Sequence, residues 1–169
     1  AALDVCGFPL CSGQVMAGNP AWCLSQEEWK RQFGNWISVP EPKALLNASI
    51  FFDFRPLYGR EELVTELQEW LLHKVKGNTP FLRAMTANAL EQQAPLSWWR
   101  DFRLGGGKEY PHTLDLKGQG IRIFVDAVRI LSLAHGVAHT NTIERLRGAR
   151  QALGMPVEEA AAMTAAFYQ

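Results

Sequence analysis

The chain has 169 residues, enough for one domain or for one domain and the tail of another. Hydrophobic residues make up 47% of it and charged residues 20%, so it has enough apolar side chains to bury a core. Its 17 Lys and Arg balance its 17 Asp and Glu, which argues against nucleic-acid binding through bulk charge. No run of about 18 apolar residues occurs, so no membrane-spanning segment is predicted.

The three cysteines, Cys6, Cys11 and Cys23, all lie near the start of the chain. An odd, clustered set without a secretion signal is typical of reduced thiols, so we expect a cytoplasmic protein. A structural zinc site needs four ligands, usually including one closely spaced cysteine pair. The cysteines are therefore interpreted as free thiols, and no metal is expected.

Residues 1–24 are rich in glycine and proline, which predicts a loop with at most one short strand. From Ser25 the pattern becomes helical, because Ser25 and Glu28 have the spacing of a capping box. Apolar residues then recur at helical spacing, with proline or glycine between the segments. Helices are predicted over residues 25–39, 42–54, 60–76, 80–90, 123–134, 140–153 and 156–169. Thr79 is the expected N-cap of the fourth of these helices. The fold class is therefore all-α, an antiparallel helical bundle preceded by a short irregular or strand segment.

Catalytic sequence templates are absent. The chain has no Gly-x-Ser-x-Gly elbow, no P-loop and no dinucleotide-binding fingerprint. His135 and His139 have the spacing of two helical metal ligands, but Gly136 is expected to end the helix between them.

The segment around Asp53 and Arg55 is the strongest local signal, because an acid and a base stand among aromatic residues where Pro56 must interrupt a helix. In one interpretation the two charges form an ion pair that pins the turn. In the other they face a cleft, where the guanidinium of Arg55 offers a planar fork to phosphate or carboxylate.

A second charged group consists of Arg122, Asp126 and Arg129, which helical spacing places on one stripe. This arrangement is as consistent with pairing inside the helix as with a ligand site. Both alternatives remain open from the sequence.

Five segments, in this order, resemble a single family. They are residues 6–17, 29–36, 47–59, 114–117 and 141–146, of which the Phe-Phe-Asp-Phe-Arg-Pro run at 51–56 is the most specific. The family is that of the putative nucleotidyltransferases of bacterial signal-transduction proteins, related to the protein-PII uridylyltransferases. The resemblance covers nearly the whole chain.

The resemblance implies a domain order. In the family, a nucleotidyltransferase core with a Gly-Ser motif and paired, magnesium-holding aspartates precedes a helical substrate-binding domain. Residues 1–24 are accordingly expected to be the C-terminal remnant of that core, and residues 25–169 the helical domain. The Gly-Ser and Asp-x-Asp motifs are absent and are expected before Ala1. The fragment is therefore expected to be inactive and to hold no cofactor, whereas the parent protein would use Mg²⁺ and a nucleoside triphosphate.

The resemblance also suggests site residues and partners. Asp53 and Arg55 would border the cleft between core and helical domain, and Lys117 and Arg145 are further substrate-binding candidates; no catalytic or metal-binding residue is expected. The expected partners are the nucleotidyltransferase core and regulatory domains of the cystathionine-β-synthase or cyclic-nucleotide-binding type, with a homodimer left open and neither nucleic acid nor membrane involved.

Two other functions remain. The chain could be a non-enzymatic interaction or dimerisation module, for which a flat apolar face around Trp98 and Trp99 would be evidence. A free-standing metal enzyme that uses the histidines or cysteines is the least favoured alternative.

Overall fold

The computed structural model describes residues 2–16, 18–91, 96, 104 and 110–168. Helices contain more than half of the chain, and the described residues form no β-strand, which confirms the all-α class. The α-helices are α1 (Ala2–Val5), α2 (Gln26–Ser38), α3 (Pro42–Phe51), α4 (Glu61–Val75), α5 (Thr79–Leu90), α6 (Arg122–His135), α7 (Thr142–Arg150) and α8 (Val157–Phe167). A 3-10 helix at Pro20–Trp22 precedes α2, and a π-helix at Lys117–Ile121 leads directly into α6.

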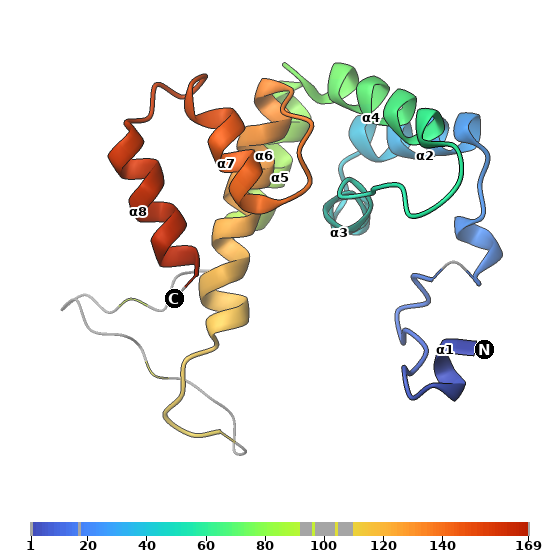
Figure 1. The fold of residues 1–169 in the computed structure, drawn as a ribbon, viewed down its shortest axis with the longest axis horizontal. Helices are drawn as coiled ribbons and strands as arrows, with labels where there is room; N and C mark the ends of the chain where they lie inside the picture. Colours follow the sequence, from blue (N-terminus) through green and yellow to red (C-terminus); the bar gives the residue numbers. More distant parts are fainter. Residues whose placement is uncertain (1, 17, 92–95, 97–103, 105–109, 169) are drawn as a thin grey trace.

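The helices form two neighbouring groups. Figure 1 shows α2, α3 and α4 at one end of the molecule and α5 to α8 at the other. Helix α2 packs on α3 and α4, while α6 packs on α5 and α7. The contacts of α3 with α5 and of α4 with α6 connect the two groups.

The main hydrophobic core lies within the first group and extends to α5 and α6. Phe33 of α2, Leu71 of α4 and Phe81 of α5 are almost completely buried. Burial of each such side chain contributes about 1.5–3 kcal/mol to the free energy of folding. The remaining buried members are Trp36, Ile37, Leu45, Ala48, Phe52, Leu67, Val75, Met85 and Leu133.

Local sequence signals fix several helix ends. The predicted capping box is present, since the side chain of Ser25 accepts from the backbone of Glu28 while Glu28 accepts from the backbone of Ser25. Gly136 ends α6 in the left-handed conformation at φ 72°, as expected. The N-cap of α5 is Asn78, one residue before the expected cap Thr79, because the Asn78 side chain accepts from the backbone N–H of Phe81.

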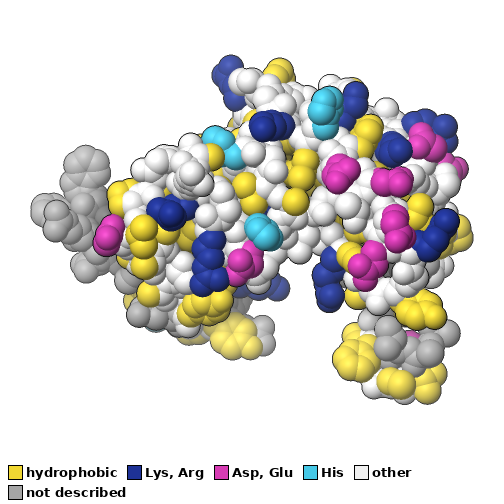
Figure 2. All heavy atoms as spheres, turned by 45° about the horizontal axis from the view of Figure 1, so that its top comes forward, with side chains coloured by type: hydrophobic (Ala, Val, Ile, Leu, Met, Phe, Trp, Pro, Cys, Tyr) yellow, Lys and Arg dark blue, Asp and Glu magenta, His cyan; other side chains and the backbone are white. Residues whose placement is uncertain are grey.

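The segment before Ser25 is irregular, and its described part contains α1 and the 3-10 helix rather than a strand. The indole of Trp22 donates to the Gln14 carbonyl at 2.9 Å, which ties the segment to itself. Val5, Phe8 and Leu10 are exposed. This segment lies apart from the helices in Figure 1. Figure 2 shows hydrophobic side chains gathered at the same end of the molecule, at the lower right.

Two further sequence expectations concern the segment around Trp98 and the absence of a membrane-spanning helix. Trp98 and Trp99, as well as the glycine triplet at 105–107, lie outside the described residues. Within the described part of the chain, no helix combines the length and the apolar character needed to cross a bilayer.

Candidate functional site

Asp53 lies in the loop after α3 and forms ion pairs with two distant arginines. Its Oδ2 is 2.7 Å from Nη2 of Arg129 on α6, and its Oδ1 is 2.6 Å from Nη2 of Arg145 on α7. Both arginines are buried, whereas Arg55 is exposed. The interpretation that Asp53 pairs with Arg55 is therefore wrong. We call the group of Asp53, Arg129 and Arg145 the clasp, because it joins the loop after α3 to α6 and α7.

The side chains of residues 52–55 point in different directions. Phe52 is 3% exposed and packs in the core, which fixes the backbone immediately before Asp53. Phe54 and Arg55 line a cavity on the α2 and α4 side. Consecutive residues of one turn therefore reach the core, the clasp and a cavity, so Asp53 and Arg55 cannot act as a pair.

Further hydrogen bonds satisfy the clasp arginines. Nη1 of Arg129 lies 2.6 Å from Oδ1 of Asp126, one turn earlier on α6, and Nε of Arg145 donates to the His139 carbonyl at 2.6 Å. Arg122 approaches Asp126 at 3.7 Å. The charged stripe on α6 thus pairs internally, and Arg129 in addition connects the helix to Asp53.

Pairing within the clasp shifts the pKa values of Asp53 and Arg129. Burial raises the pKa of Asp53, but the hydrogen bonds from Arg129 and Arg145 and their positive charges outweigh burial, so the pKa lies below its ordinary value. Burial lowers the pKa of Arg129, but the hydrogen bond and charge of Asp53, with those of Asp126, raise it overall. Asp53 and Arg129 are therefore both charged at neutral pH.

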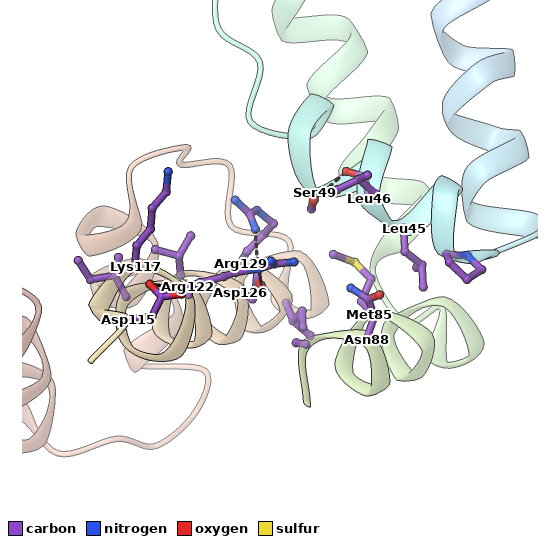
Figure 3. Close-up of a pocket in the computed structure, with 16 residues that line it drawn as sticks. Leu45, Leu46, Ser49, Met85, Asn88, Asp115, Lys117, Arg122, Asp126 and Arg129 are labelled. Atoms are coloured by element: carbon purple, nitrogen blue, oxygen red, sulfur yellow. Dashed lines mark hydrogen bonds and ion pairs between the residues drawn. The ribbon is translucent and has the colours of Figure 1, made fainter. Parts of the chain in front are cut away.

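A cavity of about 750 Å³ lies between α3, α5 and the start of α6. Figure 3 shows the labelled side chains of α6 facing those of α3 and α5 across it. Its volume falls in the range of small-molecule binding sites, about 300–1,000 Å³. The lining residues are Pro42, Leu45, Leu46, Ser49, Met85, Asn88, Ala89, Asp115, Lys117, Gly118, Ile121, Arg122, Val125, Asp126, Arg129 and Ile130. We call this space the α6 cavity.

The two long walls of the α6 cavity differ in chemistry. Lys117 and Arg122 are exposed cations on the α6 side, whereas Leu45 and Met85 belong to an apolar wall on α3 and α5. Arg129 lines the cavity and also belongs to the clasp. The α6 side therefore carries two exposed cations together with the carboxylates of Asp115 and Asp126, and it lies beside an apolar surface.

The start of α6 is shaped by a π-helical turn. The N–H of Arg122 donates to the Lys117 carbonyl, one residue further back than in an α-helix. Asp115 Oδ1 accepts from the backbone N–H of Gly118 at 2.8 Å. A Cβ at position 118 would lie 2.5 Å from Asp115 Oδ2, so a larger residue would displace the Asp115 carboxylate. The turn thereby holds Lys117 at the mouth of the cavity.

The four residues suggested by sequence do not form one site. Asp53 and Arg145 meet in the clasp, Lys117 lines the α6 cavity, and Arg55 lines the separate cavity beside α2 and α4. Sequence reasoning had placed Arg129 on a charged stripe, but it missed the pairing with Asp53, because no local pattern indicates a partner 76 residues away.

Two protein-family models match parts of the chain. Residues 79–169, more than half of it, match the family described as putative nucleotidyltransferase substrate binding domain, and the chain belongs to this family. Residues 1–43 match the family described as putative nucleotidyltransferase DUF294. No curated protein and no solved structure was found to match. The first matched range includes Lys117, Arg129 and Arg145, whereas Asp53 and Arg55 lie between the two ranges.

Proposed function

We propose that this chain is the substrate-binding part of a protein-PII uridylyltransferase-like nucleotidyltransferase, and that the α6 cavity binds the nucleoside triphosphate. The observation that supports this most is the presence of two exposed cations, Lys117 and Arg122, on one wall of a cavity whose other wall is apolar. Arg122 contacts Asp126 only at 3.7 Å, and its side chain is half exposed to solvent. The family match supports the general role of substrate binding.

Each wall has a defined task in this proposal. Lys117 and Arg122 bind phosphate oxygens through charge-assisted hydrogen bonds. The apolar side chains of α3 and α5 cover the nonpolar faces of the sugar and base, and the amide of Asn88 offers a donor and an acceptor. Arg129 already pairs with Asp53 and Asp126, so it holds α6 in place rather than binding phosphate.

The chemical step belongs to the nucleotidyltransferase core in this account. Nucleotidyl transfer depends on metal-held phosphates and positioned charges. Among the residues that the structure describes, no group of three or more His, Cys, Asp or Glu side chains has the arrangement of a metal site. We therefore propose that this chain binds substrate and that the parent protein supplies the Mg²⁺ site and the transfer.

Two measurements on the same preparation test this function. Calorimetric titration with UTP, CTP and ATP should give saturable binding, with UTP tightest if the uridylyltransferase-like assignment is correct. Incubation with Mg²⁺, labelled UTP and a PII-type acceptor should give no transfer above a buffer control. Absence of binding for all three nucleotides, or reproducible transfer by this chain, would contradict the proposal.

A second candidate is an interaction module that docks the core, regulatory domains or another copy. The observation that favours it is the exposure of the adjacent residues Leu57 and Tyr58 in the loop after α3, 83% and 102%. Contiguous exposed apolar side chains mark interaction sites. Light scattering across a concentration series distinguishes a dimerising module, whose mass doubles, from a monomeric substrate-binding domain.

A further inference from the structure

A second cavity, of about 540 Å³, lies between α2, α4 and the loop after α3. It shares no lining residue with the α6 cavity. Its lining residues are Leu24, Ser25, Gln26, Trp29, Phe33, Phe51, Phe54, Arg55, Arg60, Leu63, Val64 and Leu67. We call it the aromatic cavity, and the function proposed above gives it no role.

Four aromatic rings form a continuous surface in this cavity. The ring centroid of Trp29 lies 5.3 Å from that of Phe33 and 5.2 Å from that of Phe51, and Phe33 lies 5.9 Å from Phe54. Phe33 is buried, whereas the other three are partly exposed. Partly exposed aromatic faces fixed by their neighbours provide a stacking surface for a planar ring.

The charged groups of the cavity are two exposed arginines, Arg55 and Arg60. Within the described part of the chain, no carboxylate lies within 4.0 Å of either guanidinium. The lining side chain of Gln26 is engaged, because it donates to the Leu63 carbonyl and to Glu66. The arginines are therefore the charged groups of this cavity that remain available to a ligand.

We infer that the aromatic cavity is a binding site for a small planar aromatic anion. The ring of the ligand stacks on the exposed faces of Trp29, Phe51 and Phe54, and its anionic group pairs with Arg55 and Arg60. A guanidinium fork binds phosphate and carboxylate equally well in geometry, so the two classes of ligand share this chemistry. The volume is sufficient for a ligand of nucleotide size, within the usual range of about 300–1,000 Å³.

Calorimetric titration of the whole chain tests the site with two anionic probes. AMP represents an aromatic phosphate and indole-3-acetate an aromatic carboxylate; the tighter of the two identifies the class. The double variant Arg55→Ala/Arg60→Ala should weaken binding of that probe at least tenfold. The matched variant Lys43→Ala/Arg83→Ala, which removes two exposed cations that line neither cavity, should leave this binding within twofold. The affinity for UTP should stay within twofold of wild type in Arg55→Ala/Arg60→Ala, because neither arginine lines the α6 cavity. This measurement separates the failure of this site from the failure of the proposed nucleotide site.

Two results would overturn the inference. If neither anion binds at millimolar concentration, or if the arginine substitutions leave the affinity unchanged while circular dichroism confirms the fold, the site does not select aromatic anions. If the uncharged N-acetyl-tryptophanamide binds as tightly as the anionic probes, the cavity accepts an aromatic side chain of a polypeptide instead. Amide chemical shifts of Trp29, Phe51 and Phe54 should move on binding, which checks the location directly.

Discussion

Asp53 and Arg145 stand 92 positions apart in the sequence and form an ion pair of 2.6 Å. The side chain of Arg145 is 4% exposed and that of Asp53 28%, so the pair is largely shielded from water. Since Arg129 binds the second oxygen of the same carboxylate, one acid neutralises arginines from two helices. The clasp therefore links the loop after α3 to the family-matched part of the chain that contains α6 and α7.

Removal of the clasp carboxylate should destabilise the protein. Asp53→Ala leaves two buried guanidinium groups with fewer partners, and we expect a loss of about 3 kcal/mol in the free energy of unfolding, near the lower end of the usual cost of breaking a buried ion pair. Urea denaturation measures this loss. Glu27→Ala, which breaks the exposed pair with Lys30, is the control and should cost about 0.5 kcal/mol or less. Equal effects of the two substitutions would contradict the structural role of the clasp.

Acid should weaken the clasp. Burial raises the pKa of Asp53, but the hydrogen bonds from Arg129 and Arg145 together with their charges lower it by more than burial raises it. The folded-state pKa therefore lies below the unfolded value of about 3.9. Such a group contributes its full stability above the unfolded pKa and loses it as pH falls through the folded pKa. The free energy of unfolding should therefore decline below about pH 4, and Asp53→Asn should decline less steeply.

Glu28 provides the control for this pH series, because the hydrogen bonds of Ser25 also lower its pKa. Glu28 is exposed, so Glu28→Gln should remove only a small part of the acid dependence. If the free energy of unfolding of Asp53→Asn declined below about pH 4 as steeply as that of the wild type, the clasp would not control the acid dependence of stability.

Arg55 should be dispensable for folding. It is exposed and has no ion pair among the described residues, so Arg55→Ala should change the free energy of unfolding by no more than about 0.5 kcal/mol. The melting temperatures of Arg55→Ala and Arg129→Ala are compared. Arg129→Ala should melt at the lower temperature, because Arg129 is buried in the clasp. A large loss in Arg55→Ala would restore the interpretation that this arginine pins the turn.

Alanine substitutions at Gly118 and Gly120, in the turn before α6, should affect stability differently. Gly118→Ala places a Cβ 2.5 Å from Asp115 Oδ2 and should displace this carboxylate from its hydrogen bond with the backbone N–H of residue 118, at a cost of about 1 kcal/mol. Gly120→Ala meets nothing within 4 Å and should be neutral or stabilising, since alanine favours helix by up to about 1 kcal/mol. Thermal denaturation of both variants tests the pair, and a destabilised Gly120→Ala with an unaffected Gly118→Ala would contradict the described turn.

Local features of the fold could be predicted because their causes lie within a few residues. The capping box at Ser25 and the stop at Gly136 depend on spacing and on backbone freedom, which the sequence displays directly. The core position of Phe33 follows from helical periodicity. Even here the N-cap of α5 differs by one residue from the expectation, because Asn78 rather than Thr79 caps the helix.

The site could be predicted only in part, because it depends on contacts between distant segments. Asp53 and Arg145 were recognised as candidates, but proximity in sequence suggested Arg55 as the partner, whereas packing of α6 and α7 brings Arg129 and Arg145 to Asp53. The α6 cavity likewise combines residues of α3, α5 and α6, and no single segment contains a pattern for it.

The affinity of UTP for variants of the α6 cavity tests the central claim most directly. Lys117→Ala/Arg122→Ala should weaken binding at least tenfold, because each cation contributes a charge-assisted hydrogen bond of about 1.5 kcal/mol or more and about 1.4 kcal/mol corresponds to tenfold. Lys43→Ala/Arg83→Ala removes two exposed cations of α3 and α5 that do not line the cavity, and should change the affinity less than twofold. Equal UTP affinity in wild type and Lys117→Ala/Arg122→Ala would contradict the assignment of this cavity as the substrate site.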